Sequence, residues 1–275
     1  MKFGCCIPGG SFMPQGVSEV TPAASELLRQ GYAVTKEAGY AYMEATVGLM
    51  MQLSEEETAQ LVADTAAGRF ALSYCNSFIP PRLTICDGTH SEELHRYIAA
   101  VFARMQAVGA RLVVLGSGKA RSVPEGMRPA EAQKNLDAFL LDCDREAGRF
   151  GVTVAIEPLN RRETNMILTV GEAAALVRRL GLTHVRVLAD AFHMYCENEP
   201  FSALAEAKEL LVHTHVAEPP ERIRPGAAGG AYLTEFIRAL QSIGYEGGVT
   251  VECGFRDWPG DALTSIAFLK GVLHG

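Results

Sequence analysis

The chain has 275 residues and a formal net charge of −7, because 32 acidic residues outnumber 25 basic ones. Proteins that bind the phosphate backbone of nucleic acids usually carry a basic face, so this charge argues against a nucleic-acid partner. Hydrophobic residues make up 48% of the chain, but no run approaches the roughly 18 apolar residues of a membrane span, so a membrane partner is also not expected.

Short aliphatic and β-branched runs alternate with helical patterns along the whole chain. Six of the helical patterns are followed by a glycine, the residue that best tolerates the left-handed conformation that ends a helix; these are Gly39, Gly68, Gly109, Gly148, Gly181 and Gly244. We therefore predict eight strands, at residues 2–6, 40–46, 70–75, 111–115, 152–156, 185–189, 210–216 and 248–251.

Two helix starts are also visible in the sequence. Ser54 is followed three residues later by Glu57, the spacing of a capping box, in which each side chain accepts a hydrogen bond from the backbone of the other residue. Ser91 opens a second helical pattern, and apolar residues from Leu94 to Met105 recur there at helical spacing. This second helix should pack one face on the core.

The alternation predicts the fold class. Eight strand and helix units in 275 residues give about 34 residues per unit, the size of a βα repeat. An open doubly wound sheet also alternates in this way, but residues 8–11 lack the G-x-G-x-x-G pattern expected after its first strand. No Pro- or Ser-rich linker divides the chain, so we predict one α/β domain over residues 1–275, a single (β/α)8 TIM barrel.

Acidic and histidine residues end the last four predicted strands. Because the carboxyl ends of barrel strands meet at one face, Glu157, Asp190, His215 and Glu252 should converge there. Three carboxylates within a few ångström of each other require a cation. This oxygen-rich set suits Mn²⁺ or Mg²⁺, with Co²⁺ or Zn²⁺ possible.

Several segments resemble the xylose-isomerase-like TIM-barrel superfamily. Residues 157–165, E-P-L-N-R-R-E-T-N, are similar to its E-P-L-N-R-x-E-T-N segment, and residues 190–194, D-A-F-H-M, to its D-x-F-H-M segment. The region from His215 through Glu218 to Arg222 resembles the loop after its seventh strand, and residues 251–253 resemble its last metal strand. Within the superfamily, the chain looks most like the ketose 3-epimerases of the tagatose/psicose type and the sugar phosphate isomerases/epimerases.

The resemblance implies roles for individual residues. Glu157, Asp190, His215 and Glu252 would bind the metal, and Glu157 and Glu252 would also act as the acid and base on opposite faces of the sugar. The substrate, a sugar or a sugar phosphate, would contact Glu163, His193 and Arg222. Asn76 and Glu44 lie at the ends of the third and second predicted strands, and we expect them to contact the sugar as well. Arg224 is an alternative to Arg222, since this loop is one residue longer than the family pattern. The resemblance also implies a homo-oligomer, a dimer or a tetramer.

The implied reaction is proton transfer on a metal-bound sugar. A divalent ion that holds O2 and O3 of a ketose stabilises the enediolate formed when the C3 proton leaves, and reprotonation on the other face inverts C3. The same site could move a proton between C1 and C2, which is aldose–ketose isomerisation. A zinc-dependent abasic-site endonuclease would need more histidines and a basic face, and a non-catalytic sugar-sensing barrel would be expected to lack one of the two glutamates.

Three further features of the sequence are weaker indications of function or location. His213 could support a metal ligand or be an ordinary core histidine. Residues 116–121, G-S-G-K-A-R, could cradle a phosphate or form a solvated loop. The seven cysteines are odd in number and contain no C-x-x-C pair, and the first residues lack the apolar core of a signal peptide, so we expect reduced thiols and a cytoplasmic location.

Overall fold

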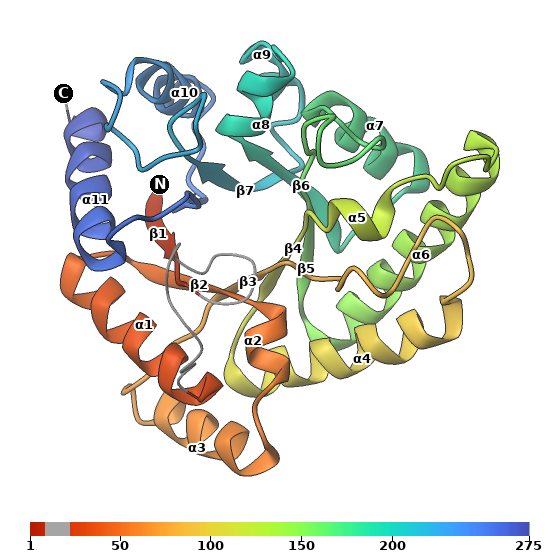
Figure 1. Cartoon of the computed structure of the whole chain (residues 1–275), viewed down its shortest axis with the longest axis horizontal. Coiled ribbons are helices and arrows are strands. Elements are labelled where there is room, and N and C mark those ends of the chain that lie inside the picture. Colours follow the sequence, from red (N-terminus) through yellow and green to blue (C-terminus); the bar gives the residue numbers. More distant parts are fainter. Residues whose placement is uncertain (9–22, 275) are drawn as a thin grey trace.

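The computed structural model, described here for residues 1–8 and 23–274, is a closed barrel of eight parallel strands in the order β1 to β8 (Figure 1). It confirms the predicted (β/α)8 fold; the segment tested above for a G-x-G-x-x-G pattern lies mostly outside the described residues. The strands are β1 (Lys2–Cys6), β2 (Tyr42–Thr46), β3 (Tyr74–Asn76), β4 (Leu112–Leu115), β5 (Thr153–Ile156), β6 (Val185–Asp190), β7 (Leu211–Val216) and β8 (Gly248–Val251).

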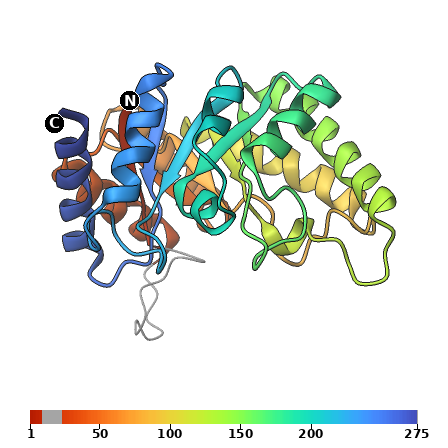
Figure 2. The same ribbon diagram turned by 90° about the horizontal axis from the view of Figure 1, so that it is seen from above.

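Helices surround the strands, and the side view in Figure 2 shows them packed along the barrel. The helices of the described part of the chain are α1 (Ala24–Ala38), α2 (Val47–Met51), α3 (Glu55–Ala66), α4 (Ser91–Val108), α5 (Gly118–Arg121), α6 (Pro129–Phe150), α7 (Val170–Leu180), α8 (Ala191–Cys196), α9 (Ser202–Glu206), α10 (Ala231–Ser242) and α11 (Trp258–His274). Within these described residues, no helix combines the length and the apolar character needed to cross a membrane.

The helix boundaries follow the local signals with one exception. Ser54 and Glu57 form the predicted capping box, and α4 buries the predicted apolar face. Gly148 was expected to end a helix, but it lies inside α6, which ends at Gly151 in the left-handed conformation. A Cβ atom at Gly148 would lie 2.9 Å from the His184 ring, so this glycine permits close packing and does not stop the helix.

The third strand is shorter than predicted. The run at residues 70–75 reads as a strand because it is apolar, yet only Tyr74–Asn76 joins the barrel. Phe70 and Leu72 are buried in the core before the strand begins. Their hydrophobicity therefore reflects packing against the helices and not strand pairing.

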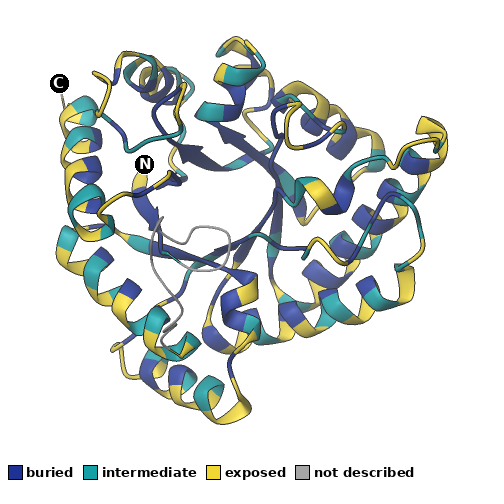
Figure 3. Ribbon diagram, viewed as in Figure 1, coloured by how far each residue is buried: buried dark blue, intermediate teal, exposed yellow. Residues whose placement is uncertain are grey.

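Side chains alternate between two cores along each strand. The main core lies between the strands and the helices, whose inner faces are buried in Figure 3. A second, smaller cluster faces the barrel interior on β4, β5 and β6 and consists of Leu112, Val114, Ala155 and Leu188. Polar side chains occupy the interior on β2, β7 and β8, where Glu44, His213 and Thr250 are fully buried. One half of the interior is thus apolar and the other half is a hydrogen-bonded network.

A β-bulge sets the register of β7 against β6. Val187 is opposite Leu211, but the next residue, Leu188, is opposite His213, so Val212 is the extra residue. A bulge re-aims the side chains that follow it. As a result, Asp190 and His215 are direct neighbours across the two strands.

We predict that the Ser54→Ala variant loses about 1 kcal/mol of unfolding free energy, because the Glu57 amide at the start of α3 then loses its side-chain acceptor. The shift of the urea unfolding midpoint measures this loss. Ser242→Ala, at the exposed end of α10, is the control and should stay within about 0.5 kcal/mol of the parent protein. Equal effects of the two substitutions would contradict the capping role.

Candidate metal and active site

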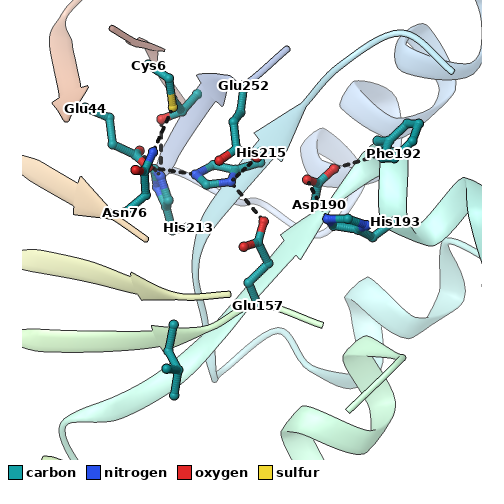
Figure 4. Close-up of polar contacts among 12 residues, drawn as sticks. Cys6, Glu44, Asn76, Glu157, Asp190, Phe192, His193, His213, His215 and Glu252 are labelled. Atoms are coloured by element: carbon teal, nitrogen blue, oxygen red, sulfur yellow. Dashed lines mark hydrogen bonds and ion pairs between the residues drawn. The ribbon is translucent and has the colours of Figure 1, made fainter. Parts of the chain in front are cut away.

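Four side chains from neighbouring strands converge at the carboxyl end of the barrel. Glu157, Asp190, His215 and Glu252 each offer a ligand atom, and these atoms all lie within 4.8 Å of one another. Each follows an inward-facing residue by two positions, so the strand period of two directs them to the interior. All four are buried, and Figure 4 shows them around the His215 ring.

The hydrogen bonds of His215 reveal a conflict that a cation would resolve. Its Nε2 atom lies 3.0 Å from Glu44 Oε1, and a carboxylate can only accept, so Nε2 carries a proton. Its Nδ1 atom lies 3.1 Å from Glu157 Oε1 and 3.4 Å from Glu252 Oε2. On a neutral ring, the Nδ1 lone pair would face two carboxylate oxygens, which is unfavourable without positive charge between them.

Burial and the charges of neighbouring side chains shift the pKa values of Glu157, Glu252 and His215. Burial, followed by the charge of Glu252, raises the pKa of Glu157. Burial would also raise the pKa of Glu252, but cationic His215 and Arg222 outweigh burial and lower it to about 2. Burial opposes the charged form of His215, yet the carboxylates of Glu252 and Glu44 raise its pKa well above the usual range. A proton on His215 therefore supplies the positive charge that these acids require.

This donor set fits a divalent cation. Asp190 Oδ2 is buried and has no hydrogen-bond partner among the described residues, as expected of an oxygen that faces an ion. Three carboxylates and one imidazole nitrogen match the ligands that Mn²⁺ and Mg²⁺ accept. An ion among these groups would replace the proton on His215 Nδ1, while Glu44 holds the other ring nitrogen, an arrangement typical of metal-binding histidines.

Glu44 lies beneath this cluster, on the far side of the His215 ring (Figure 4). It has no exposed surface, and its second oxygen lies 2.9 Å from His213 Nε2. His213 is also 3.2 Å from the Thr250 hydroxyl. Both Glu44 oxygens are therefore occupied by imidazoles. We propose that Glu44 orients His215 and that His213 supports Glu44, a role different from the substrate contact expected for Glu44.

Asn76 also lies on this inner side of the ring. Its Nδ2 atom is 3.2 Å from Cys6 Sγ, and its Oδ1 atom is buried without a partner in the part of the chain that the structure describes. Cys6, Glu44 and His215 form a second close group of possible ligand atoms. Sequence reasoning missed Cys6, because nothing distinguishes a cysteine in an apolar strand from an ordinary core residue. A substrate contact for Asn76 stays a prediction.

Three further side chains surround the outer side of the cluster. Arg222 Nη2 lies 2.5 Å from Glu252 Oε2 and 3.5 Å from Asp190 Oδ2, and its Nη1 lies 3.6 Å from Glu163 Oε1. His193 Nε2 lies 3.6 Å from Asp190 Oδ2. Arg224 instead pairs with Asp261. Of the two arginines left open by the sequence, Arg222 is therefore the one at the site.

A cavity of about 450 Å³ opens above the cluster. Its acidic and basic lining residues are Glu157, Glu163, Glu252, Arg222 and Lys119, and its walls include Ile79, Pro80, Pro81 and Leu159. Gly116 also lines it, and a Cβ atom there would lie 2.3 Å from Glu157 Oε2. Gly116 thus leaves space for the Glu157 carboxylate.

Residues 116–121 are only partly available to a ligand. Lys119 lines the cavity, but Arg121 is fully buried and donates to the Leu115 carbonyl oxygen at 2.9 Å. Arg121 therefore fixes the loop to the end of β4. The two cations of this segment cannot both face a phosphate, as a phosphate cradle would require.

Comparisons with known proteins agree with this architecture. A family model described as xylose isomerase-like TIM barrel matches residues 32–272. The chain is 37% identical over 107 residues to a D-psicose 3-epimerase of Agrobacterium fabrum. The aligned region covers 38% of this chain and 36% of the relative. It is 33% identical over 141 residues to a 3-dehydro-D-guloside 4-epimerase of Escherichia coli. This aligned region covers 50% of this chain and 53% of the relative.

These matches span about a third to a half of the curated relatives' own length. The three-dimensional similarity is more extensive. A solved D-psicose 3-epimerase from Clostridium cellulolyticum, crystallised with D-tagatose, has a TM-score of 0.82 and 20% identity, and the match covers 99% of each chain. At this identity, the similarity shows a shared fold.

We predict that Glu44→Gln weakens Mn²⁺ binding by about 10- to 100-fold, because an amide has no charge and only one oxygen for two imidazole donors. Isothermal titration calorimetry on the metal-stripped protein measures the dissociation constant. Asp64→Asn is the matched control, since Asp64 is also a buried carboxylate but pairs with Arg29 and Arg69 away from the site. An unchanged Mn²⁺ affinity in Glu44→Gln would remove the orienting role.

Proposed function

The chain belongs to the xylose isomerase-like TIM barrel family, and from this membership and the site geometry we propose that it is a divalent-metal-dependent sugar isomerase or epimerase. Within this class, the proposed reaction is inversion at C3 of a ketose. The names of the relatives support an epimerase. The observation that carries the proposal is the pair of buried carboxylates, Glu157 and Glu252, that face the same point from β5 and β8 and line the same cavity.

Glu157, Asp190, His215 and Glu252 would hold the ion. When bound, it supplies positive charge that lowers the cost of negative charge on the substrate oxygens. The support for this assignment is the Asp190 oxygen, which has no hydrogen-bond partner within residues 1–8 and 23–274, and the conflict at His215 Nδ1. The oxygen-rich ligand set favours Mn²⁺ or Mg²⁺ over Zn²⁺.

The two glutamates move the proton. One carboxylate removes the C3 proton, and the electron pair of the broken C–H bond passes into the adjacent carbonyl group. The other carboxylate then delivers a proton to the opposite face of C3, so the configuration inverts without net oxidation or reduction. Glu157 and Glu252 are suited to this because they come from different strands and approach the cavity from different directions (Figure 4).

The remaining polar groups would orient the sugar. Arg222 and His193 offer N–H donors close to Asp190, and Glu163 offers an acceptor 3.6 Å from Arg222. Leu159, Ile79 and the two neighbouring prolines form the apolar part of the cavity wall. Such a wall accepts the C–H face of a sugar and limits the access of water to the reacting carbon.

We favour an unphosphorylated ketose as substrate. Among the described residues, the charged side chains that line the cavity are three acids and two cations, and one of these cations, Arg222, is already paired with Glu252. Arg121, the second cation of residues 116–121 besides Lys119, is buried and donates to the backbone, so it does not face the cavity. This balance of charge disfavours the binding of a negatively charged phosphate group in the cavity. Proton transfer between C1 and C2 remains the alternative reaction, because it needs the same two carboxylates.

We predict that Glu157→Gln and Glu252→Gln each lower the turnover of a ketose by about 100- to 10,000-fold, since an amide cannot take or give the proton. NMR in deuterated water, on a panel of ketoses and ketose phosphates, reports both the rate and the carbon that gains deuterium. Glu221→Gln, an exposed acid on the loop after β7, is the control and should keep the wild-type rate.

Deuterium exchange at wild-type rates in either folded glutamine variant would contradict the two-carboxylate mechanism. Label at C3 with inversion identifies the epimerase. Label at C2 of an aldose product, or at C1 of the recovered ketose, identifies the isomerase instead.

We also predict that removal of the metal with a chelator lowers the melting temperature and abolishes turnover, and that about one equivalent of Mn²⁺ restores both. A ligand that binds only the folded state stabilises it by mass action, and this ion also relieves the repulsion among Glu157, Asp190 and Glu252. Differential scanning fluorimetry and elemental analysis measure the two effects. Full activity in protein that contains no stoichiometric divalent ion would exclude the assignment.

A further inference from the structure

The hydrogen bonds around His193 determine which of its nitrogens carries the proton. The backbone N–H of Asn160 donates to His193 Nδ1 at 3.2 Å, and Asn160 Nδ2 lies 2.9 Å from the same atom. A backbone amide can only donate, so Nδ1 must be an acceptor. The proton of the neutral ring is therefore on Nε2.

The side-chain amide of Asn160 cannot be reversed. Its Oδ1 atom accepts from the backbone N–H of Arg162 at 3.0 Å, which fixes the oxygen on that side. Its Nδ2 atom consequently faces His193 and also donates to Glu163 Oε1 at 2.9 Å. Asn160 is buried, so water does not compete for these bonds. One side chain thus holds two of the groups assigned to the substrate.

The Nε2–H group of His193 is a buried donor without a hydrogen-bond partner in the described part of the chain. Its nearest acceptor, Asp190 Oδ2, is 3.6 Å away, which is too long for a good hydrogen bond. Arg222 Nη2 lies 3.5 Å from the same oxygen. Two donors therefore converge beside one proposed metal ligand. A buried donor left unpaired costs free energy, which is recovered when a ligand oxygen accepts from it.

We propose that Asn160 is a positioning residue that keeps His193 as the neutral Nε2–H tautomer and holds Glu163 beside it. The site then presents a fixed donor, His193, and a fixed acceptor, Glu163, to the oxygens of the substrate. This inference rests on the proposed function for its kinetic consequence, but the tautomer itself is a property of the protein alone.

The first test is the tautomer in the wild-type protein. Long-range ¹H–¹⁵N correlation spectra of ¹⁵N-histidine-labelled protein, loaded with Mg²⁺ to avoid paramagnetic broadening, distinguish a protonated ring nitrogen from an unprotonated one. We expect His193 to have its proton on Nε2, and His193→Gln identifies its signals. A proton on Nδ1 in the wild-type protein would overturn the proposal whether or not any sugar is turned over.

The second test exchanges the donor for an acceptor. In Asn160→Asp, the carboxylate cannot donate to His193 Nδ1 or to Glu163, while the backbone N–H of residue 160 still faces Nδ1. We expect the His193 ring and the Glu163 side chain to lose their fixed positions, so that the ¹⁵N signals of His193 shift and kcat/KM for the ketose falls on the order of a hundredfold. Asn165→Asp is the control, because Asn165 lies in the same loop but, among the described residues, its side chain pairs with the backbone of Val123 and not with His193 or Glu163. It should keep the wild-type histidine spectrum and rate.

A further measurement separates this role from a general structural one. The Mn²⁺ dissociation constant of folded Asn160→Asp should match that of Asn165→Asp, because Asn160 contacts none of the four proposed ligands. Asn160→Asp with an unchanged His193 spectrum and unchanged kcat/KM would overturn the proposal. If the wild-type protein turns over no ketose while His193 has the expected tautomer, the proposed function fails and the assignment of Asn160 as the residue that fixes the His193 ring stands.

Discussion

The central physical constraint in this molecule is the repulsion among three carboxylates that the barrel buries within a few ångström of one another. An isolated buried charge is very costly, and three of the same sign require compensation from their surroundings. The neighbouring groups reflect this requirement. Arg222 pairs with Glu252 and lies near Asp190, and His215 faces Glu157 and Glu252. A divalent ion would complete the compensation and return His215 to its neutral form.

This constraint extends to fully buried groups beneath the four converging residues. His215 can present Nδ1 to the acids only if its other nitrogen has an acceptor, and Glu44 provides one from the opposite side of the barrel interior. Glu44 is itself a buried charge, and its second oxygen is paired with His213. The polar half of the barrel interior therefore supports the orientation of one imidazole ring. The apolar half, on β4 to β6, supplies ordinary packing and leaves this network surrounded by nonpolar groups.

Next to the cavity, hydrogen bonds hold the proposed substrate-binding side chains in place, as ion pairs hold the proposed metal ligands. Asn160 fixes the His193 ring and Glu163 through three donated bonds, so these groups need little rearrangement when a sugar binds. Preorganised donors and acceptors of this kind lower the cost of reaching the transition state. The proposed metal ligands and the proposed sugar contacts are thus held by two separate sets of supporting residues, Glu44 with His213 below and Asn160 beside the cavity.

The sequence by itself determined the barrel, most strand positions and the four residues that converge at its mouth. These features depend on local rules, namely the strand period of two, the glycines that end helices and the fact that parallel strands place their carboxyl ends at one face. Only the tertiary structure decided which residues support the site. Glu44 and His215 are 171 positions apart, the choice of Arg222 over Arg224 follows from the path of one loop, and the bulge at Val212 places His215 beside Asp190. Such contacts depend on barrel closure and on register, and no local pattern encodes either.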